Sequence, residues 1–206
     1  MARAGRGLRV VAGAARGRRL RAPPGDLARP TTDRVKEALF AALGAAPVED
    51  RIVLDLYAGS GALAIEALSR GAVGAVLVDR ARPAIDTIAA NLAVTGFDGQ
   101  ARTLRRDVGA FLRAPPPAEA PFGLVLLDPP YSLATAEVAR VLGALVEPGW
   151  LADGASVVLE RPISGEAPPL PAVLTLAWQR GYGDTLLTVM THRRTRDRSA
   201  PEAGEA

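Results

Sequence analysis

The chain has 206 residues, 49% of them hydrophobic and 23% charged, a composition typical of a globular protein with a sizeable core. It has no cysteine, which excludes disulfides, thiolate metal sites and a cysteine nucleophile. The sequence shows no signal peptide and no apolar run of the roughly 20 residues that a membrane helix needs. We therefore expect a soluble cytoplasmic monomer with no membrane partner and no metal.

Charge is distributed unevenly along the chain. The net charge is +3, yet residues 1–36 hold ten basic and two acidic side chains and so carry +8, which leaves −5 on the remainder. A basic segment of this kind indicates a polyanionic partner, although a solvated basic tail has the same composition.

The first predicted elements follow an irregular start. Residues 1–30 are rich in Arg, Gly and Pro, and we expect them to form a small irregular or β-hairpin extension. The pattern over residues 35–43 predicts a helix with one apolar face. Thr31 and Thr32 precede this helix, and either hydroxyl is suited to cap it.

From Arg51 onward, apolar runs alternate with helical patterns. Strands are predicted over residues 52–56, 75–78, 101–104, 124–127 and 156–159, and helices over 62–69, 83–95 and 134–146. Continuous apolar strands separated by helices indicate a parallel sheet that is covered on both faces. Residues 185–190 are expected to add a final antiparallel strand, and the polar residues 194–206 to form a disordered tail.

Acidic residues lie at or just after the carboxyl ends of four of the predicted strands, namely Asp55, Asp79, Asp107 and Asp128. Ligands of such sheets bind beyond the carboxyl ends of the strands. A carboxylate there is expected to accept hydrogen bonds from hydroxyls and amines without being desolvated. Because Asp also favours the start of a loop, a single one of the four carries little weight.

The first turn, which reads DLYAGSG, contains Gly59 and Gly61, and both let the backbone pass close to a ligand. They also fit the dinucleotide fingerprint, with Asp79 at about the expected distance, so an NAD or flavin enzyme remains an alternative. Asp55 weighs against it, because a carboxylate there repels a pyrophosphate but suits the ammonium of S-adenosylmethionine. Asp79 would then accept from the ribose hydroxyls and Asp107 from the adenine amino group.

The tetrad Asp128-Pro129-Pro130-Tyr131 is the most specific signal in the chain. Its two prolines remove two backbone donors and stiffen the chain. The Asp128 carboxylate and the Pro129 carbonyl are two acceptors suited to an exocyclic NH2, and Tyr131 offers a face on which a flipped base can stack. Such acceptors favour methyl transfer from a sulfonium to an aromatic amine, because they stabilise the positive charge that develops on the nitrogen. The absence of cysteine excludes the thiolate route to C5-methylpyrimidines.

The chain resembles the bacterial 16S ribosomal RNA guanine-N2 methyltransferases, which are class I S-adenosylmethionine-dependent enzymes. The matching stretches are RGRRL at residues 16–20, RPTTDRVKE at 29–37, LDLYAGSGAL at 54–63, EALSRG at 66–71, the DPPY tetrad, GWL at 149–151 and YGDT at 182–185. The DPPY tetrad alone occurs in any amino methyltransferase, including DNA adenine-N6 enzymes. The RPTTDR run is far more particular to this family.

This resemblance implies an α/β fold, a Rossmann-like seven-stranded class I methyltransferase sheet with a small basic N-terminal β extension. Residues 1–30 would be an RNA-binding extension and residues 31–193 the catalytic domain. S-adenosylmethionine would be the methyl donor and S-adenosylhomocysteine the product. The partner would be 16S rRNA in the 30S subunit or its assembly intermediate, with guanine 966 as the expected target.

The resemblance also assigns residues to roles. Catalysis falls to Asp128, Pro129, Pro130 and Tyr131. Cofactor binding falls to Thr32, Asp55, Tyr57, Gly59, Ser60, Gly61, Asp79 and Asp107. Apart from the resemblance, we predict that Arg16, Arg18, Arg19 and Arg34 of the basic N-terminal segment bind RNA phosphates.

Other functions remain open from the sequence. A DNA amino methyltransferase would share the fold, although only about 30 residues precede it and no target-recognition domain is evident. A non-catalytic RNA-binding module could retain the same strand ends, and the dinucleotide oxidoreductase is the last alternative.

Overall fold

The computed structural model of the protein describes residues 8–24 and 33–193. Its elements in chain order are α1 (Asp33–Leu43), β1 (Ile52–Leu56), α2 (Ala62–Ser69), β2 (Gly74–Asp79), α3 (Arg82–Thr95), the short 3-10 helix η1 (Asp98–Gln100), β3 (Ala101–Arg105), α4 (Val108–Leu112), β4 (Phe122–Leu127), α5 (Thr135–Leu145), β5 (Leu151–Pro162), β6 (Leu174–Tyr182) and β7 (Thr185–His192). The predicted threonine cap and the predicted tail over residues 194–206 lie outside the described residues.

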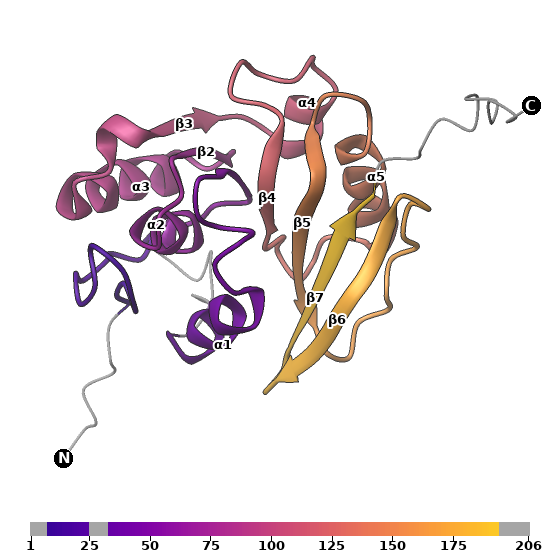
Figure 1. Ribbon diagram of the computed structural model, residues 1–206, viewed down its shortest axis with the longest axis horizontal. Coiled ribbons are helices and arrows are strands. Elements are labelled where there is room, and N and C mark those ends of the chain that lie inside the picture. Colours follow the sequence, from indigo (N-terminus) through magenta and orange to yellow (C-terminus); the bar gives the residue numbers. More distant parts are fainter. Residues whose placement is uncertain (1–7, 25–32, 194–206) are drawn as a thin grey trace, which may run out of the picture.

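The strands form one seven-stranded sheet in the order β3-β2-β1-β4-β5-β7-β6 (Figure 1). Neighbours among β1 to β5 pair in parallel, and β7 lies antiparallel between β5 and β6. The predicted parallel sheet with a final antiparallel strand is therefore confirmed. Since β1 to β5 all point the same way, their carboxyl ends meet at one edge of the sheet.

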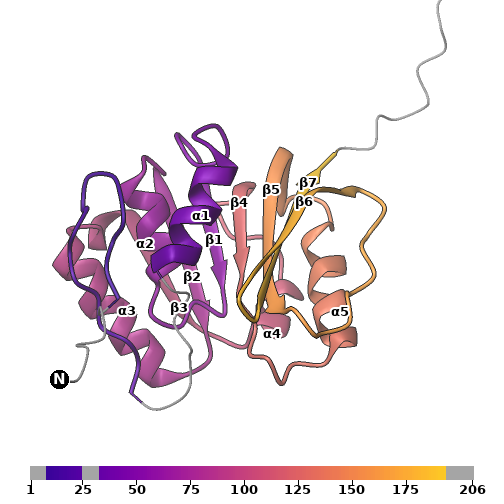
Figure 2. The same cartoon turned by 90° about the horizontal axis from the view of Figure 1, so that it is seen from below.

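Two apolar cores lie on opposite faces of the sheet, because successive residues of a strand point to opposite sides. Val53, Leu124 and Val158 pack with α1, α2 and α3. Leu54 and Val125, one position along their strands, pack instead with α4 and α5. Figure 2 shows α1, α2 and α3 on one side of the strands and α4 and α5 on the other. The uninterrupted apolar runs of the central strands follow from this burial on both faces.

Three features differ from the sequence-based expectation. β6 was not predicted, and it is one of the two edge strands of the sheet, with most of its side chains exposed. α4 was not predicted either, because five residues are too few to show a helical period. β5 begins at Leu151 rather than Ser156, and an irregularity in its pairing with β4 separates its first paired residue from the rest.

Residues 8–24 form a short hairpin that packs against the fold, in agreement with the predicted β extension. Arg9 and Arg19 form an antiparallel bridge, and Leu20 donates its N–H to the Leu8 carbonyl. The backbone N–H groups of Val11 and Ala12 donate to the Glu66 carboxylate of α2, over 2.7 and 3.0 Å. The hairpin is thus fixed to α2 through buried polar contacts.

Close approach of the hairpin to α2 requires a glycine at position 13. Gly13 has a φ of +80°, and a Cβ there would come within 1.7 Å of the Ser69 carbonyl oxygen. The neighbouring Ala14 and Ala15 donate their N–H groups to the Ser69 carbonyl and hydroxyl, respectively. The backbone of the hairpin therefore lies directly on the last turn of α2.

In the part of the chain that the structure describes, no helix is both long and apolar enough to span a bilayer.

Candidate functional site

A cleft of about 680 Å³ lies at the carboxyl ends of the parallel strands. Its walls come from the residues that follow β1, β2, β3 and β4, together with Glu160 of β5 and parts of α2, α3, α4 and α5. The volume is within the range of small-molecule sites in proteins. The strand-end location predicted for the site is therefore where the structure has a cleft.

The turn after β1 has an unusual backbone. Tyr57, Gly59 and Gly61 all have positive φ values, of 63°, 55° and 74°. Glycine adopts this conformation freely, whereas for Tyr57 it costs roughly 1–2 kcal/mol. Strain of this kind is found most often at functional sites, where the surrounding fold maintains it.

Asp79 connects the end of β2 to this turn. Its Oδ2 accepts the N–H of Gly59 over 2.9 Å, and its Oδ1 accepts the N–H of Ala81 over 2.8 Å. A carboxylate has about four lone-pair positions, so both oxygens can still accept a hydrogen bond from a ligand. Asp79 therefore holds the glycine turn in place and also faces the cleft.

Asp55 lies beneath the N-terminus of α2. Gly61 at the helix N-cap has no side chain to offer, and the Asp55 Oδ2 instead accepts the Ala64 N–H over 3.2 Å. Only 2% of Asp55 is exposed, so the expectation that this carboxylate stays solvated is wrong. The pKa of Asp55 is raised to about 8, chiefly by burial and to a smaller extent by the nearby Asp79 carboxylate, against the opposing effect of the Ala64 hydrogen bond.

Asp107 and Tyr57 line the part of the cleft near α4. The Asp107 Oδ1 accepts the Ala110 N–H over 2.9 Å and so caps α4. Burial, followed in size by the charge of Asp107, raises the pKa of Tyr57 to about 12, so its phenol stays neutral. Both residues are in the cleft, as predicted.

The DPPY tetrad follows β4 on the other side of the cleft. Asp128 donates its backbone N–H to the Leu56 carbonyl, which ties the tetrad to the end of β1. The Pro130 carbonyl accepts the Leu133 N–H, and the Tyr131 hydroxyl lies 3.2 Å from the Thr185 hydroxyl of β7. Tyr131 lines the cleft, and 42% of its surface is exposed.

The structure brings ten of the twelve predicted catalytic and cofactor residues to this cleft. They are Asp55, Tyr57, Gly59, Ser60, Asp79, Asp107, Asp128, Pro129, Pro130 and Tyr131. Gly61 does not line it, and a Cβ on Gly61 would instead crowd Leu77 and Ile88. Thr32 lies outside the described residues.

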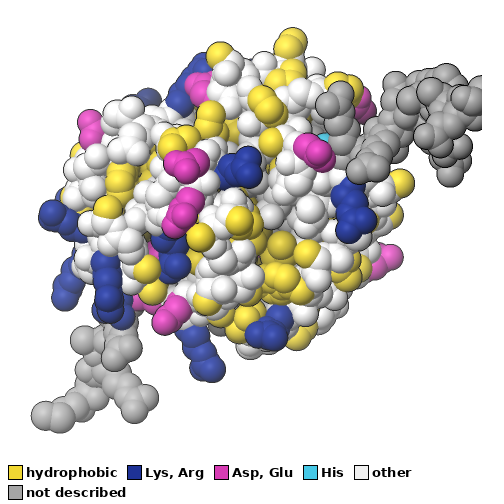
Figure 3. All heavy atoms as spheres, in the orientation of Figure 1, with side chains coloured by type: hydrophobic (Ala, Val, Ile, Leu, Met, Phe, Trp, Pro, Cys, Tyr) yellow, Lys and Arg dark blue, Asp and Glu magenta, His cyan; other side chains and the backbone are white. Residues whose placement is uncertain are grey.

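The four predicted RNA-binding arginines are exposed and lie outside the cleft. Arg16, Arg18 and Arg19 are carried by the hairpin, and Arg34 by α1. Figure 3 shows basic side chains gathered along the edge of the molecule where Figure 1 shows the hairpin in indigo. Lys36, also in the basic segment, is completely buried, and desolvation lowers its pKa.

Several residues of the cleft were missed by sequence reasoning. Glu160 is the clearest, because it directly follows the predicted fifth strand, as Asp128 follows the fourth. The strand-end rule that selected four aspartates could have found it. Arg80, Arg113 and Pro23 also line the cleft, and no local pattern distinguishes them.

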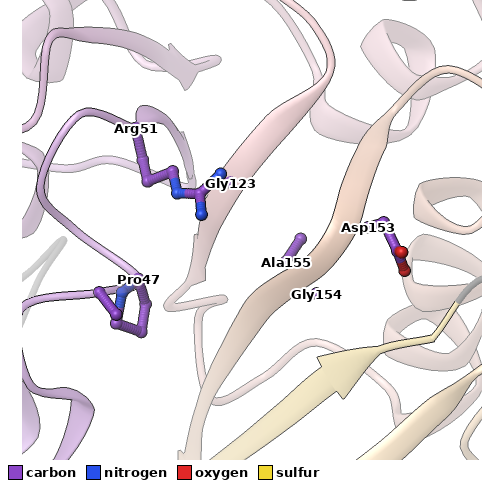
Figure 4. Close-up of a pocket in the computed structure, with 7 residues that line it drawn as sticks. Pro47, Arg51, Gly123, Asp153, Gly154 and Ala155 are labelled. Carbon is purple, nitrogen blue, oxygen red and sulfur yellow. The ribbon is translucent and has the colours of Figure 1, made fainter.

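A second and smaller hollow lies at the opposite ends of the strands from the cleft. It measures about 130 Å³ and is lined by Arg51, Gly123 and Asp153, among others, at the amino ends of β1, β4 and β5 (Figure 4). It is too small for a nucleoside-sized ligand. Among residues 8–24 and 33–193, no three His, Cys, Asp or Glu side chains are grouped so that they could hold a metal ion.

Comparison with known proteins shows to which family the chain belongs. The family model described as "Conserved hypothetical protein 95" matches residues 8–191, nearly the whole chain. The chain belongs to this family. Among its relatives, the Escherichia coli (strain K12) protein named "Ribosomal RNA small subunit methyltransferase D" is 39% identical over 176 residues, 85% of each chain. The Bacillus subtilis (strain 168) protein named "Putative rRNA methyltransferase YlbH" is 36% identical, over 90% of this chain and all of the relative.

Solved structures agree with this assignment to the Conserved hypothetical protein 95 family. The structure titled "Putative methyltransferase yhhF from Escherichia coli" superimposes with a TM-score of 0.78 at 36% identity, covering 91% of this chain and 98% of that one. The family resemblance and the class I methyltransferase fold inferred from the sequence are therefore confirmed. A more distant structure, titled as a putative RNA methyltransferase from Pyrococcus horikoshii, shares the fold at 17% identity.

Proposed function

We propose that the protein transfers a methyl group from S-adenosylmethionine to the exocyclic N2 of a guanine in 16S rRNA, within assembling 30S subunits. The proposed target is guanine 966, and the protein is proposed to act as a monomer. The observation that carries this proposal is the shared cleft of the glycine turn and the DPPY tetrad. The names of the relatives support an rRNA substrate.

The DPPY tetrad supplies acceptors for an amino group. No hydrogen bond is made to the Pro129 carbonyl within the described part of the chain, whereas the Pro130 carbonyl is already engaged by Leu133. The Asp128 carboxylate and the Pro129 carbonyl are the pair proposed to hold the two N2 hydrogens of guanine. Such contacts favour the ammonium that forms during transfer, which then loses its proton to water.

The other half of the cleft fits the proposed methyl donor. Asp55 is a buried carboxylate with an elevated pKa, which an ammonium group would stabilise in its charged form. Asp79 and Asp107 face the cleft as acceptors for hydroxyl and amino groups. S-adenosylmethionine, when bound, supplies an electrophilic methyl on a sulfonium, and Asp55, Asp79 and Asp107 would hold and orient it.

Binding of the methyl donor is expected to release protons through Asp55. With a pKa of about 8, Asp55 is mostly protonated at pH 7, and pairing with an ammonium requires its carboxylate form. Release should thus be a little under one proton per molecule bound at pH 7. It should fall towards zero at pH 8, because the free α-amino group has a pKa of about 8 and about half of the ligand must then take up a proton to bind as the ammonium. Calorimetry in buffers of different ionisation enthalpy measures this number. An Asp55→Asn variant should release none, and equal release by both proteins would contradict the assignment.

The exposed arginines of the hairpin are proposed to bind RNA phosphates. Replacing Arg16, Arg18 and Arg19 together by alanine should weaken RNA binding and reduce the slope of log K against log salt by about 2 to 3. Arg34→Ala should reduce it by about one in the same assay. Arg102→Ala is the control, because its guanidinium is already paired with Glu119. An unchanged slope in the triple variant would remove these arginines from the interface.

Methyl transfer to small ribosomal subunits tests the proposed function. The protein is incubated with tritiated S-adenosylmethionine and 30S subunits that lack the modification, and the modified base is mapped by mass spectrometry. N2-methylguanine in 16S rRNA is the expected product. Transfer to duplex DNA alone, or RNA binding with no transfer, would overturn the proposal. Stabilisation by NAD rather than by S-adenosylmethionine in a thermal-shift assay would point to the oxidoreductase instead.

A further inference from the structure

Glu160 lies next to Asp128 near the carboxyl ends of the neighbouring strands β5 and β4. The last paired row of β4 and β5 joins Leu127 to Leu159, so Asp128 and Glu160 occupy the next row. Neighbouring strands lie about 4.8 Å apart, which makes these two positions adjacent. Both residues line the cleft.

Both side chains belong to the same face of the sheet. Leu126 and Val158, two residues before Asp128 and Glu160, pack into the core beneath α1, α2 and α3, and alternation along a strand returns to the same face after two residues. The partner of Glu160 on β7 is Leu187, which belongs to that core as well. Only 6% of Glu160 is exposed. Its side chain therefore forms part of the inner wall of the cleft, next to the DPPY tetrad.

The Watson–Crick edge of guanine is complementary to an acceptor at this position. Next to the N2 amino group, guanine carries an N1–H donor, whereas adenine has an N1 acceptor beside its amino group. A base whose amino group is held by Asp128, and whose Watson–Crick edge is turned towards β5, presents its N1 to the adjacent wall. A carboxylate in that wall accepts a hydrogen bond from guanine and repels the N1 lone pair of adenine.

We propose that Glu160 accepts the N1–H of the target guanine and thereby selects guanine over bases that lack this hydrogen. The inference rests on the proposed function and extends it, since it assigns base selection to a residue outside the DPPY tetrad. Glu160 also has an interaction partner within the protein, so a purely structural role is the rival explanation. Base selection and a purely structural role are distinguished by comparing two substrates that differ only in the target base.

The experiment uses reconstituted small-subunit particles with guanine or 2-aminopurine at the methylated position. 2-Aminopurine keeps the 2-amino group, but its N1 is an acceptor and it lacks O6. For the wild type, kcat/KM should favour guanine by about a hundredfold or more, because a site built around a donor rejects analogues without it. In Glu160→Gln the side-chain amide can donate to N1, and the preference should fall by about tenfold or more. Loss of O6 affects both proteins alike and cancels in the comparison.

The controls distinguish failure of this inference from failure of the proposed function. Glu166→Gln removes the same charge from an exposed position in the loop after β5, and it should keep the wild-type preference. If Glu160→Gln slows transfer to both bases equally, its role is structural and the inference is wrong. The same holds if the variant loses affinity for S-adenosylmethionine while its base preference stays unchanged. If the wild type methylates neither particle, the proposed function itself fails.

Discussion

Replacing Asp128 by alanine is expected to reduce the rate of methyl transfer by about a hundredfold to a thousandfold. The variant loses a carboxylate that lines the cleft at the end of β4 and that we propose to hold an N2 hydrogen of the target guanine. Because this contact strengthens as positive charge develops on the nitrogen, its loss lowers kcat rather than substrate binding alone. Single-turnover rates at saturating S-adenosylmethionine measure the effect.

Asparagine at position 128 should be less damaging than alanine. The amide keeps one oxygen acceptor in the same place, although it gives up the negative charge. Asp153→Ala serves as the matched control, because Asp153 lies at the opposite edge of the sheet and should leave the rate unchanged. A rate for Asp128→Ala within a few fold of the wild type would exclude Asp128 from the transfer step. So would a loss that is explained entirely by weaker binding of S-adenosylmethionine.

The largest loss of stability is expected from Glu66→Ala. The Glu66 carboxylate is fully buried and accepts hydrogen bonds from Val11, Ala12 and Arg70, with Lys36 Nζ 4.0 Å away. Its removal leaves the N–H groups of Val11 and Ala12 without their acceptor. It also removes a negative charge that stabilises the buried ammonium of Lys36. Breaking a buried ion pair by removing one partner costs about 3–5 kcal/mol, and we expect a loss of that size in the free energy of unfolding.

Urea denaturation measures this loss, and hydrogen exchange shows where it acts. Amides of residues 8–24 should lose protection first, because Glu66 fixes the hairpin to α2. Glu37→Ala removes an exposed carboxylate from α1 and should change stability by less than about 0.5 kcal/mol. An equal effect of the two substitutions would show that the buried carboxylate does not secure the hairpin.

Sequence patterns predicted the elements whose signal is local. The central strands are apolar on both faces, and α3 (Arg82–Thr95) lies within one residue of the predicted helix over residues 83–95, with Gly96 as its C-cap at a φ of 78°. β6 escaped prediction because an exposed edge strand needs no apolar run. The strand-end aspartates were found because parallel strands bring their carboxyl ends together, whatever the intervening sequence.

What the sequence could not reveal depends on long-range packing. Lys36 reads as one more basic residue of an RNA-binding segment, yet the hairpin covers it, and its ammonium donates to the Arg9 carbonyl. The elevated pKa of Asp55 likewise follows from burial beneath α2. Neither environment has a signature in neighbouring residues, because each is created by segments far apart in the chain.

One side chain joins the hairpin to the glycine turn. The Asn91 amide on α3 accepts the Arg21 N–H and donates to the carbonyls of both Arg21 and Ser60. Asn91 thereby attaches the hairpin, which carries the arginines proposed to bind RNA, to the turn that lines the cleft. On the proposed function, an RNA whose phosphates are bound by these arginines can place only a nucleotide at one particular distance along its chain in the cleft. The spacing between the hairpin and the cleft would then select the nucleotide that is methylated. Lengthening the hairpin would therefore change which nucleotide is reached.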